Sequence, residues 1–216
     1  LKDVYFATSE ASFIDGNIGK LLYRGYNIDD MARNSTFEET VYLLLYGKLP
    51  TAKELSDFDA QLRANRTLPR ELLQVIDIVK ASHPMDVLRT AVSALAAFDP
   101  DTADNSKEAT LRKGIRLTAQ APTIVAAHDR IRQGKAAVDP NPQLGHAANF
   151  LYMLTGTRPN ALSTRAFDIA LVLHADHELN ASTFAARVAA DIFITAWPSA
   201  ASTSAPRPST RARRRS

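Results

Sequence analysis

The residues best suited to chemistry gather in one short segment. Residues 174–180 read His-Ala-Asp-His-Glu-Leu-Asn, so two imidazoles and two carboxylates fall within five positions. Such groups can bind an anion, hold a metal ion or move a proton near neutral pH. The segment follows an apolar run at residues 169–173, which indicates that it lies at the end of a helix. The pattern therefore predicts a polar site for a small anion at this helix end.

A metal ion is the alternative ligand for this segment. The spacing is not His-Glu-x-x-His, and the rest of the sequence marks out no distant third ligand. The chain also has no cysteine, which excludes a thiolate-bound metal and a disulfide. We therefore expect no metal site.

The composition predicts one large ordered domain. The 216 residues are 45% hydrophobic and include only 8 glycines and 11 prolines, so they can bury a sizeable core. The longest apolar runs are far too short to cross a bilayer, and the N-terminus lacks a targeting pattern. We therefore expect a cytoplasmic protein that contacts no membrane.

The positive charge belongs to the end of the chain. The net charge is +3, but five arginines lie in the last ten residues, so the first 206 residues carry 3 − 5 = −2. Residues 198–216 consist almost wholly of Pro, Ala, Ser, Thr and Arg, and they lack the large apolar residues of a core. We expect a disordered basic tail at residues 197–216 after a helical domain at residues 1–196. The tail lacks interleaved aromatic residues, so we expect no nucleic-acid binding.

The elements that would position the polar segment are mostly helices. Strand-favouring residues occur only near the N-terminus, at 4–8, 12–14 and 20–23, and the turn residues at 15–19 predict that the last two runs form a hairpin. After Tyr26 the pattern is helical. The fold class is therefore mainly α with a short N-terminal β-hairpin.

The helix boundaries follow from capping residues and prolines. Capping boxes at residues 35–38 and 51–54 predict two helix starts. Further helices are expected to begin near residues 69, 85, 106, 143 and 163. Pro122 is expected to kink the long helical pattern over 107–133 or to break it into two helices.

Four further motifs accompany the polar segment: Ile14-Asp-Gly, Leu22-Tyr-Arg-Gly-Tyr26, Phe37-Glu-Glu and Asn149-Phe-Leu-Tyr-Met-Leu-Thr-Gly156. With them, residues 1–190 resemble the citrate synthase family, including the methylcitrate synthases. The resemblance implies the N-terminal portion of a multi-helical large domain, and a homodimer in the complete protein. It also implies an acyltransferase that condenses acetyl-CoA or propionyl-CoA with oxaloacetate and needs no other cofactor.

The resemblance also assigns roles within the polar segment. In the family, the second histidine of the His-x-Asp-His-Glu motif hydrogen-bonds oxaloacetate, which gives that role to His177. His174 is a second candidate contact, although we favour an orienting role for it, and Asn180 either contacts substrate or caps the next helix. Asp176 and Glu178 are expected to orient the imidazoles or cap backbone groups, because a free acid here would repel a dicarboxylate.

The family's other reacting groups are an aspartate base, two histidines in Leu-His-Gly and Gly-His-x-Val motifs, and several arginines. The resemblance places all of them after residue 190, where this sequence has no matching motif. Because such groups act as a unit, we expect the chain to be inactive alone. The alternative is a non-catalytic helical scaffold or interaction protein derived from the family.

Overall fold

The computed structural model describes residues 9–179 and 182–186 of the chain. The described residues up to Glu178 belong to one compact unit, and the described residues from Leu179 onward belong to another. In the second unit, residues 182–186 are helical. The expectations for residues 4–8, Asn180 and the tail at 197–216 lie outside the described residues.

The predicted hairpin is present. Strand β1 (Ser12–Asp15) pairs antiparallel with β2 (Lys20–Tyr23), with Ser12 opposite Tyr23 and Asp15 opposite Lys20. The Asp15 carboxylate accepts a hydrogen bond from the Asn17 N–H at 2.9 Å, and Gly19 takes a φ of +63°, so the turn uses the local chemistry that its sequence predicts. A short third strand, β3 (Tyr26–Asn27), pairs with β2 and was not predicted.

Apart from the connecting segments, the rest of the first unit, as far as it is described, is helical, which confirms the mainly α fold class. The helices are α1 (Ile28–Asn34), α2 (Phe37–Tyr46), α3 (Ala52–Ala64), α4 (Arg70–Ile78), α5 (Pro84–Leu95), α6 (Lys107–Arg132), α7 (His146–Thr155) and α8 (Ala161–Leu173). None of the described helices has the length and apolarity needed to span a bilayer.

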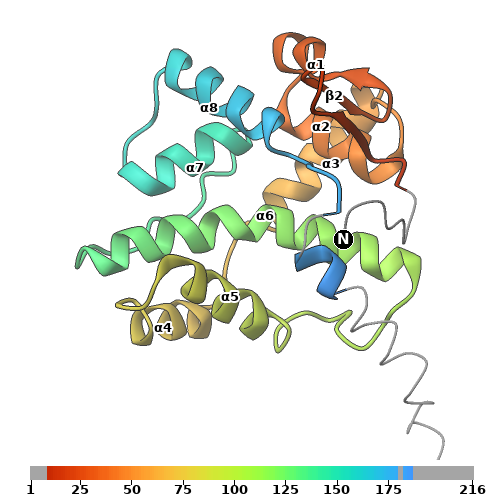
Figure 1. Cartoon of the computed structure of the whole chain (residues 1–216). Helices are drawn as coiled ribbons and strands as arrows, with labels where there is room; N and C mark the ends of the chain where they lie inside the picture. The colour runs from red at the N-terminus through yellow and green to blue at the C-terminus, as the bar shows by residue number, and fades with distance from the viewer. Residues whose placement is uncertain (1–8, 180–181, 187–216) are drawn as a thin grey trace, which may run out of the picture. The chain divides into compact units, whose positions relative to one another are not determined.

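Helix α6 organises the packing of this unit. It contacts α4 and α5 on one side and α3 and α7 on the other, as Figure 1 shows. One hydrophobic cluster joins α4, α5 and α6 around Leu72, Ile76 and Val87, which are fully buried. A second cluster joins α2 and α3 to α6 around Phe58 and Leu62. Burial of these side chains is the main favourable term in folding.

A third hydrophobic cluster positions the polar segment. Tyr23 of β2, Leu43 of α2 and Val172 of α8 have no exposed surface and pack together with Met31 of α1. Val172 belongs to the last turn of α8, so this cluster fixes the end of α8 against the hairpin. The two regions meet although they lie about 150 residues apart in the chain.

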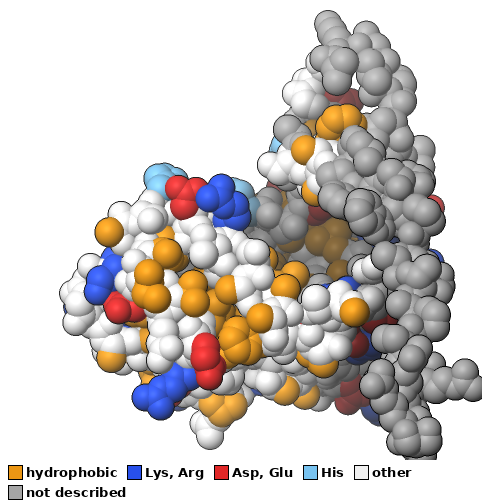
Figure 2. Space-filling model, turned by 90° about the horizontal axis from the view of Figure 1, so that it is seen from below, with side chains coloured by type: hydrophobic (Ala, Val, Ile, Leu, Met, Phe, Trp, Pro, Cys, Tyr) orange, Lys and Arg blue, Asp and Glu red, His pale blue; other side chains and the backbone are white. Residues whose placement is uncertain are grey.

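The face formed by α4 and α5 carries exposed apolar side chains. Figure 2 views this face from below, and hydrophobic side chains gather there with the charged ones mainly around them. Ile78 at the end of α4 is 81% exposed, and Met85 at the start of α5 is 63% exposed.

Three helix boundaries differ from the prediction. The first capping box is formed by Thr36 and Glu39, one residue later than predicted, while the second, formed by Thr51 and Glu54, is confirmed. Helices α7 and α8 begin at residues 146 and 161 rather than near 143 and 163. Of the kink or break expected at Pro122, the break is wrong, because α6 runs through the proline as one helix, and the kink stays a prediction. The helix contacts neighbours on both sides, and this packing offsets the hydrogen bond that proline removes.

Candidate functional site

The polar segment begins where α8 ends. His174 is the C-cap of α8, and its N–H donates to the carbonyls of Leu171 and Val172. After Leu173 the chain leaves helical geometry, and Asp176 then bonds to Tyr23 of the β-hairpin. The segment therefore has a rigid helix on one side and a strand edge on the other.

Helix α8 is itself braced against α1 and α2. The Arg165 guanidinium donates to the carbonyls of Ala32, Arg33 and Ser35 at 2.6–3.0 Å and to the Asp168 carboxylate at 2.9 Å. The buried Asp168 carboxylate also accepts from the Phe37 N–H, the first donor of α2, at 3.0 Å. These charge-assisted bonds fix α8, and with it the start of the polar segment.

Asp176 is tied to the hairpin through its side chain and its backbone. The Ser12 hydroxyl donates to the Asp176 carboxylate. The Tyr23 hydroxyl accepts from the Asp176 N–H and donates to the Asp176 carbonyl, both at 3.2 Å. Burial raises the pKa of the Tyr23 phenol, so the hydroxyl keeps the proton that it donates.

Glu178 is tied to the same hairpin. Its carboxylate accepts from the Ile14 N–H at 2.9 Å, and its own N–H lies 3.2 Å from both the Ser12 hydroxyl and the Asp176 carboxylate. Its φ is +60°, a left-handed conformation that is costly for a residue with a side chain. Both acids of the segment thus bond to backbone or hydroxyl groups rather than act as free bases.

The His174 ring is bonded to its own helix. Its Nδ1 lies 2.7 Å from the Ala170 carbonyl, and because a carbonyl only accepts, Nδ1 carries the proton. The ring is exposed. This contact gives His174 a structural role, and a contact with substrate through Nε2 stays a prediction.

His177 lies between the two anchored acids and has an exposed side chain. Within residues 9–179 and 182–186, no hydrogen bond to its imidazole is found. The residues on either side of it are fixed, while its ring remains accessible. Among the described residues, the His177 side chain thus has no role in holding the fold together through hydrogen bonds.

The third candidate, Asn180, lies outside the described residues, so both its cap and its ligand roles stay predictions. Among the residues that the structure describes, no group of three or more His, Asp or Glu side chains could hold a metal ion. Asp176 and Glu178 are engaged with the hairpin, which explains why the acids next to the histidines form no such group.

A cavity of about 470 Å³ opens beside the segment. Its wall includes His174 and Asp176, but His177 does not line it, and most of its other lining side chains are apolar. None of the described lining residues is a lysine or an arginine. A dicarboxylate bound at His177 would therefore take its cationic partners from outside this cavity.

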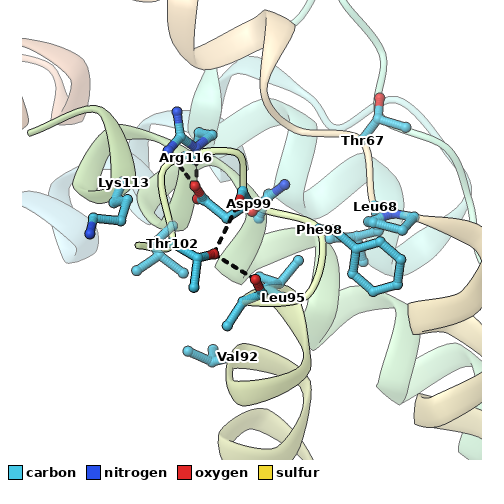
Figure 3. Close-up of a pocket in the computed structure, with 13 residues that line it drawn as sticks. Thr67, Leu68, Val92, Leu95, Phe98, Asp99, Thr102, Lys113 and Arg116 are labelled. Carbon is cyan, nitrogen blue, oxygen red and sulfur yellow. Dashed lines mark hydrogen bonds and ion pairs between the residues drawn. The ribbon is translucent and has the colours of Figure 1, made fainter. Parts of the chain in front are cut away.

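A second cavity, of about 500 Å³, lies between α5 and α6 and is shown in Figure 3. Part of its polar rim is internally paired: Arg116 donates to Asp99 at 2.7 and 2.8 Å, and the Thr102 hydroxyl donates to the carbonyls of Ala96 and Asp99. Its walls are apolar and contain no residue of the polar segment. This cavity is not part of the candidate site.

A buried polar pair was not predicted from the sequence. The Glu38 carboxylate of α2 accepts from the His146 N–H at 2.7 Å, at the first residue of α7. Burial raises the pKa of Glu38, and burial, with a smaller effect of the Arg66 charge, lowers the pKa of His146 to about 4. The imidazole packs against the Phe37 ring with centroids 4.8 Å apart. The pair joins two helices and lies outside the polar segment.

The hairpin residues of the site were also missed. Sequence reasoning named the histidines and the acids but not Ser12, Ile14 or Tyr23 as their partners. The only signal in the sequence is that Ile14 and Tyr23 belong to motifs of the same resemblance as the polar segment.

Fold and site together define a helical protein that presents an exposed histidine between a helix end and a β-hairpin. A family model described as citrate synthase, C-terminal domain, matches residues 1–203. A citrate synthase from Haloferax volcanii is 48% identical over 194 residues, which cover 87% of this chain and 51% of that protein.

Two solved structures show the same similarity. A citrate synthase from Pyrobaculum aerophilum matches with a TM-score of 0.84 and 44% identity, over 88% of this chain and 50% of the other. One from Thermoplasma acidophilum, solved as a ternary complex with carboxymethyl coenzyme A and oxaloacetate, matches with a TM-score of 0.83 and 29% identity, again over 88% and 50%. The chain belongs to the citrate synthase family. It spans about half the length of the curated relatives it matches.

Proposed function

We propose that this chain supplies the oxaloacetate-binding histidine of a citrate synthase-type site, and that His177 is that histidine. The observation that carries the proposal is the position of His177. Its ring is exposed and without a hydrogen bond to the described residues, while Asp176 and Glu178 on either side are held by the hairpin. An imidazole in this position can donate a hydrogen bond to a carboxylate or ketone oxygen.

The substrates are proposed from the family. The complex of the Thermoplasma citrate synthase with oxaloacetate and carboxymethyl coenzyme A supports oxaloacetate as the ligand and a coenzyme A derivative as its partner. The reaction removes an α-proton from acetyl-CoA or propionyl-CoA, and the enol then attacks the ketone of oxaloacetate. Water then hydrolyses the resulting thioester, which releases CoA. The condensation step needs a carboxylate base and cationic groups for the dicarboxylate.

The described acids near His177 do not suit the role of base. Both accept hydrogen bonds from the hairpin, which tie their carboxylates to that position. The motifs that carry the family's base and arginines are absent from these 216 residues. We therefore propose that the chain alone binds oxaloacetate weakly and does not release CoA. A homodimer and a cytoplasmic location also remain proposals.

Calorimetric titration with oxaloacetate tests this function. With one main contact present, we expect a Kd on the order of millimolar. His177→Gln should weaken binding roughly tenfold, the effect of losing one hydrogen bond to a charged group. His83→Gln, at an exposed histidine at the start of α5, is the matched control and should change Kd less than about twofold. Equal binding by the wild type and His177→Gln would refute the proposal, and oxaloacetate-dependent CoA release would refute the inactivity of the chain.

A non-catalytic scaffold is the second candidate function. The exposed apolar residues Ile78 and Met85 favour it, because such side chains on neighbouring helices can serve association. Size-exclusion chromatography at several concentrations distinguishes the two. A stable monomer or dimer that binds no oxaloacetate would support the scaffold.

A further inference from the structure

The β-hairpin contributes three groups to the segment that carries His177. These are the hydroxyls of Ser12 and Tyr23 and the N–H of Ile14, and they bond to the residues on both sides of His177 rather than to His177 itself. The bonds join parts of the chain more than 150 residues apart. Because the residues on both sides of His177 are held by these hydrogen bonds, the backbone direction at His177 is fixed.

The hairpin side of the contact is rigid. Ser12 is 8% exposed and Tyr23 is fully buried, and the Tyr23 ring packs in the cluster that also holds Val172 of α8. The two residues face each other across the β1–β2 pair. Their hydroxyls are therefore held in fixed positions on neighbouring strands.

Glu178 forms its contacts with the hairpin in a backbone conformation that has an energetic cost. Its φ of +60° places it in the left-handed region, which a residue with a side chain adopts only when its surroundings require it. Among the described strands, β1 lies at an edge of the sheet, and its Ile14 N–H donates a hydrogen bond to the Glu178 carboxylate. The strained residue directly follows His177, so the strain and the bond together direct the chain at this position.

The hydrogen bonds from the hairpin also hold the two carboxylates that flank His177. Two free carboxylates next to the imidazole would repel a dicarboxylate such as oxaloacetate. Here the Asp176 carboxylate accepts from the Ser12 hydroxyl and the Glu178 carboxylate from the Ile14 N–H. These donors hold both acids at the hairpin and offset part of their charge.

We propose that Ser12 and Tyr23 are positioning residues, which hold His177 in the orientation that binds oxaloacetate. The hairpin is then a functional part of the ligand site as well as a structural cover for α1 and α8. This inference rests on the proposed role of His177, and it adds residues that act on the ligand only through that histidine.

Four variants of the 216-residue chain test the inference. Ser12→Ala removes the bond to the Asp176 carboxylate, Tyr23→Phe removes both bonds to the Asp176 backbone, and Ser12→Thr keeps the hydroxyl. Thr123→Val is the matched control, because the buried Thr123 hydroxyl donates to the Arg66 carbonyl at 2.9 Å, far along the chain from the hairpin. For each variant, oxaloacetate affinity is measured by calorimetry and unfolding by urea.

We expect Ser12→Ala and Tyr23→Phe each to weaken oxaloacetate binding about tenfold, the lower end of the effect seen when partners that orient a metal-binding side chain are lost. Ser12→Thr should bind as the wild type does. Thr123→Val should lose stability to a similar degree and keep its affinity. If the hairpin had a merely structural role, Ser12→Ala and Tyr23→Phe would also lose stability and keep their affinity. Wild-type affinity in Ser12→Ala and Tyr23→Phe would overturn the inference alone. No binding by the wild type would overturn the proposed function and the inference together.

Discussion

The buried His146 gives the chain an acid-sensitive stability. Its pKa falls from 6.5 to about 4 in the folded protein, because burial and the nearby Arg66 charge disfavour the imidazolium. Between these values the unfolded chain binds the proton and the folded chain does not, so stability is lost as the pH falls below 6.5. The change in pKa corresponds to about 3 kcal/mol in the free energy of unfolding, and about 2 kcal/mol of this is lost when the pH is lowered from 7 to 4.5.

A His146→Leu variant removes this titrating group and keeps an apolar side chain against Phe37. Urea unfolding followed by circular dichroism should show that its free energy of unfolding drops by about 2 kcal/mol less than that of the wild type between pH 7 and 4.5. Burial raises the pKa of Glu38, so this residue makes both proteins more stable as the pH falls. Its effect cancels when the two proteins are compared, and the difference between them reports on the histidine. His83→Gln, at an exposed histidine, is the control. Equal pH dependence in the wild type and His146→Leu would refute the reasoning.

Three further substitutions test the fold through urea or thermal unfolding. Thr36→Ala removes the capping hydroxyl of α2 and should cost about 1 kcal/mol, and no loss would argue against the capping box. Leu72→Ala empties a fully buried site between α4, α5 and α6 and should cost roughly 2–5 kcal/mol, whereas less than about 1 kcal/mol would contradict a packed core there. Gly156→Ala forces a side chain onto a φ of +78°, with its Cβ 3.3 Å from the Arg130 guanidinium, and should cost about 1–2 kcal/mol. An unchanged midpoint for this variant would contradict the left-handed end of α7.

The elements with local signals could be predicted from the sequence. The hairpin follows from its turn residues, and the helices after Thr51 and Ser106 follow from caps that lie within three residues of the groups they bond. The capping box of α2 shows the limit of such signals. Both Ser35 with Glu38 and Thr36 with Glu39 fit the pattern, and the choice depends on Glu38 turning inward to bond α7.

The continuity of α6 could not be predicted for a related reason. A proline inside a helix costs about 3 kcal/mol by local rules, which favours a break at Pro122. Whether that cost is offset depends on how much surface the helix buries against its neighbours. The packing of α6 against helices on both sides becomes visible only in the fold.

Part of the candidate site could be proposed from the sequence. The spacing of polar residues after an apolar run identified the segment, and the resemblance selected His177 within it. Its partners Ser12 and Tyr23 lie more than 150 residues earlier, and no local pattern links a serine in a strand to an aspartate after a helix. Such pairings are set by the tertiary packing of the hairpin against α8.

The most direct test of the oxaloacetate site is histidine side-chain NMR during a titration with oxaloacetate. The chain has 5 histidines, so each imidazole signal can be assigned with single His→Gln variants. The account predicts that the His177 signal shifts most, in a saturable way, while the signals of His83 and His128 stay in place. A His177 signal that does not move, or signals that all move alike, would contradict the assignment of oxaloacetate binding to His177.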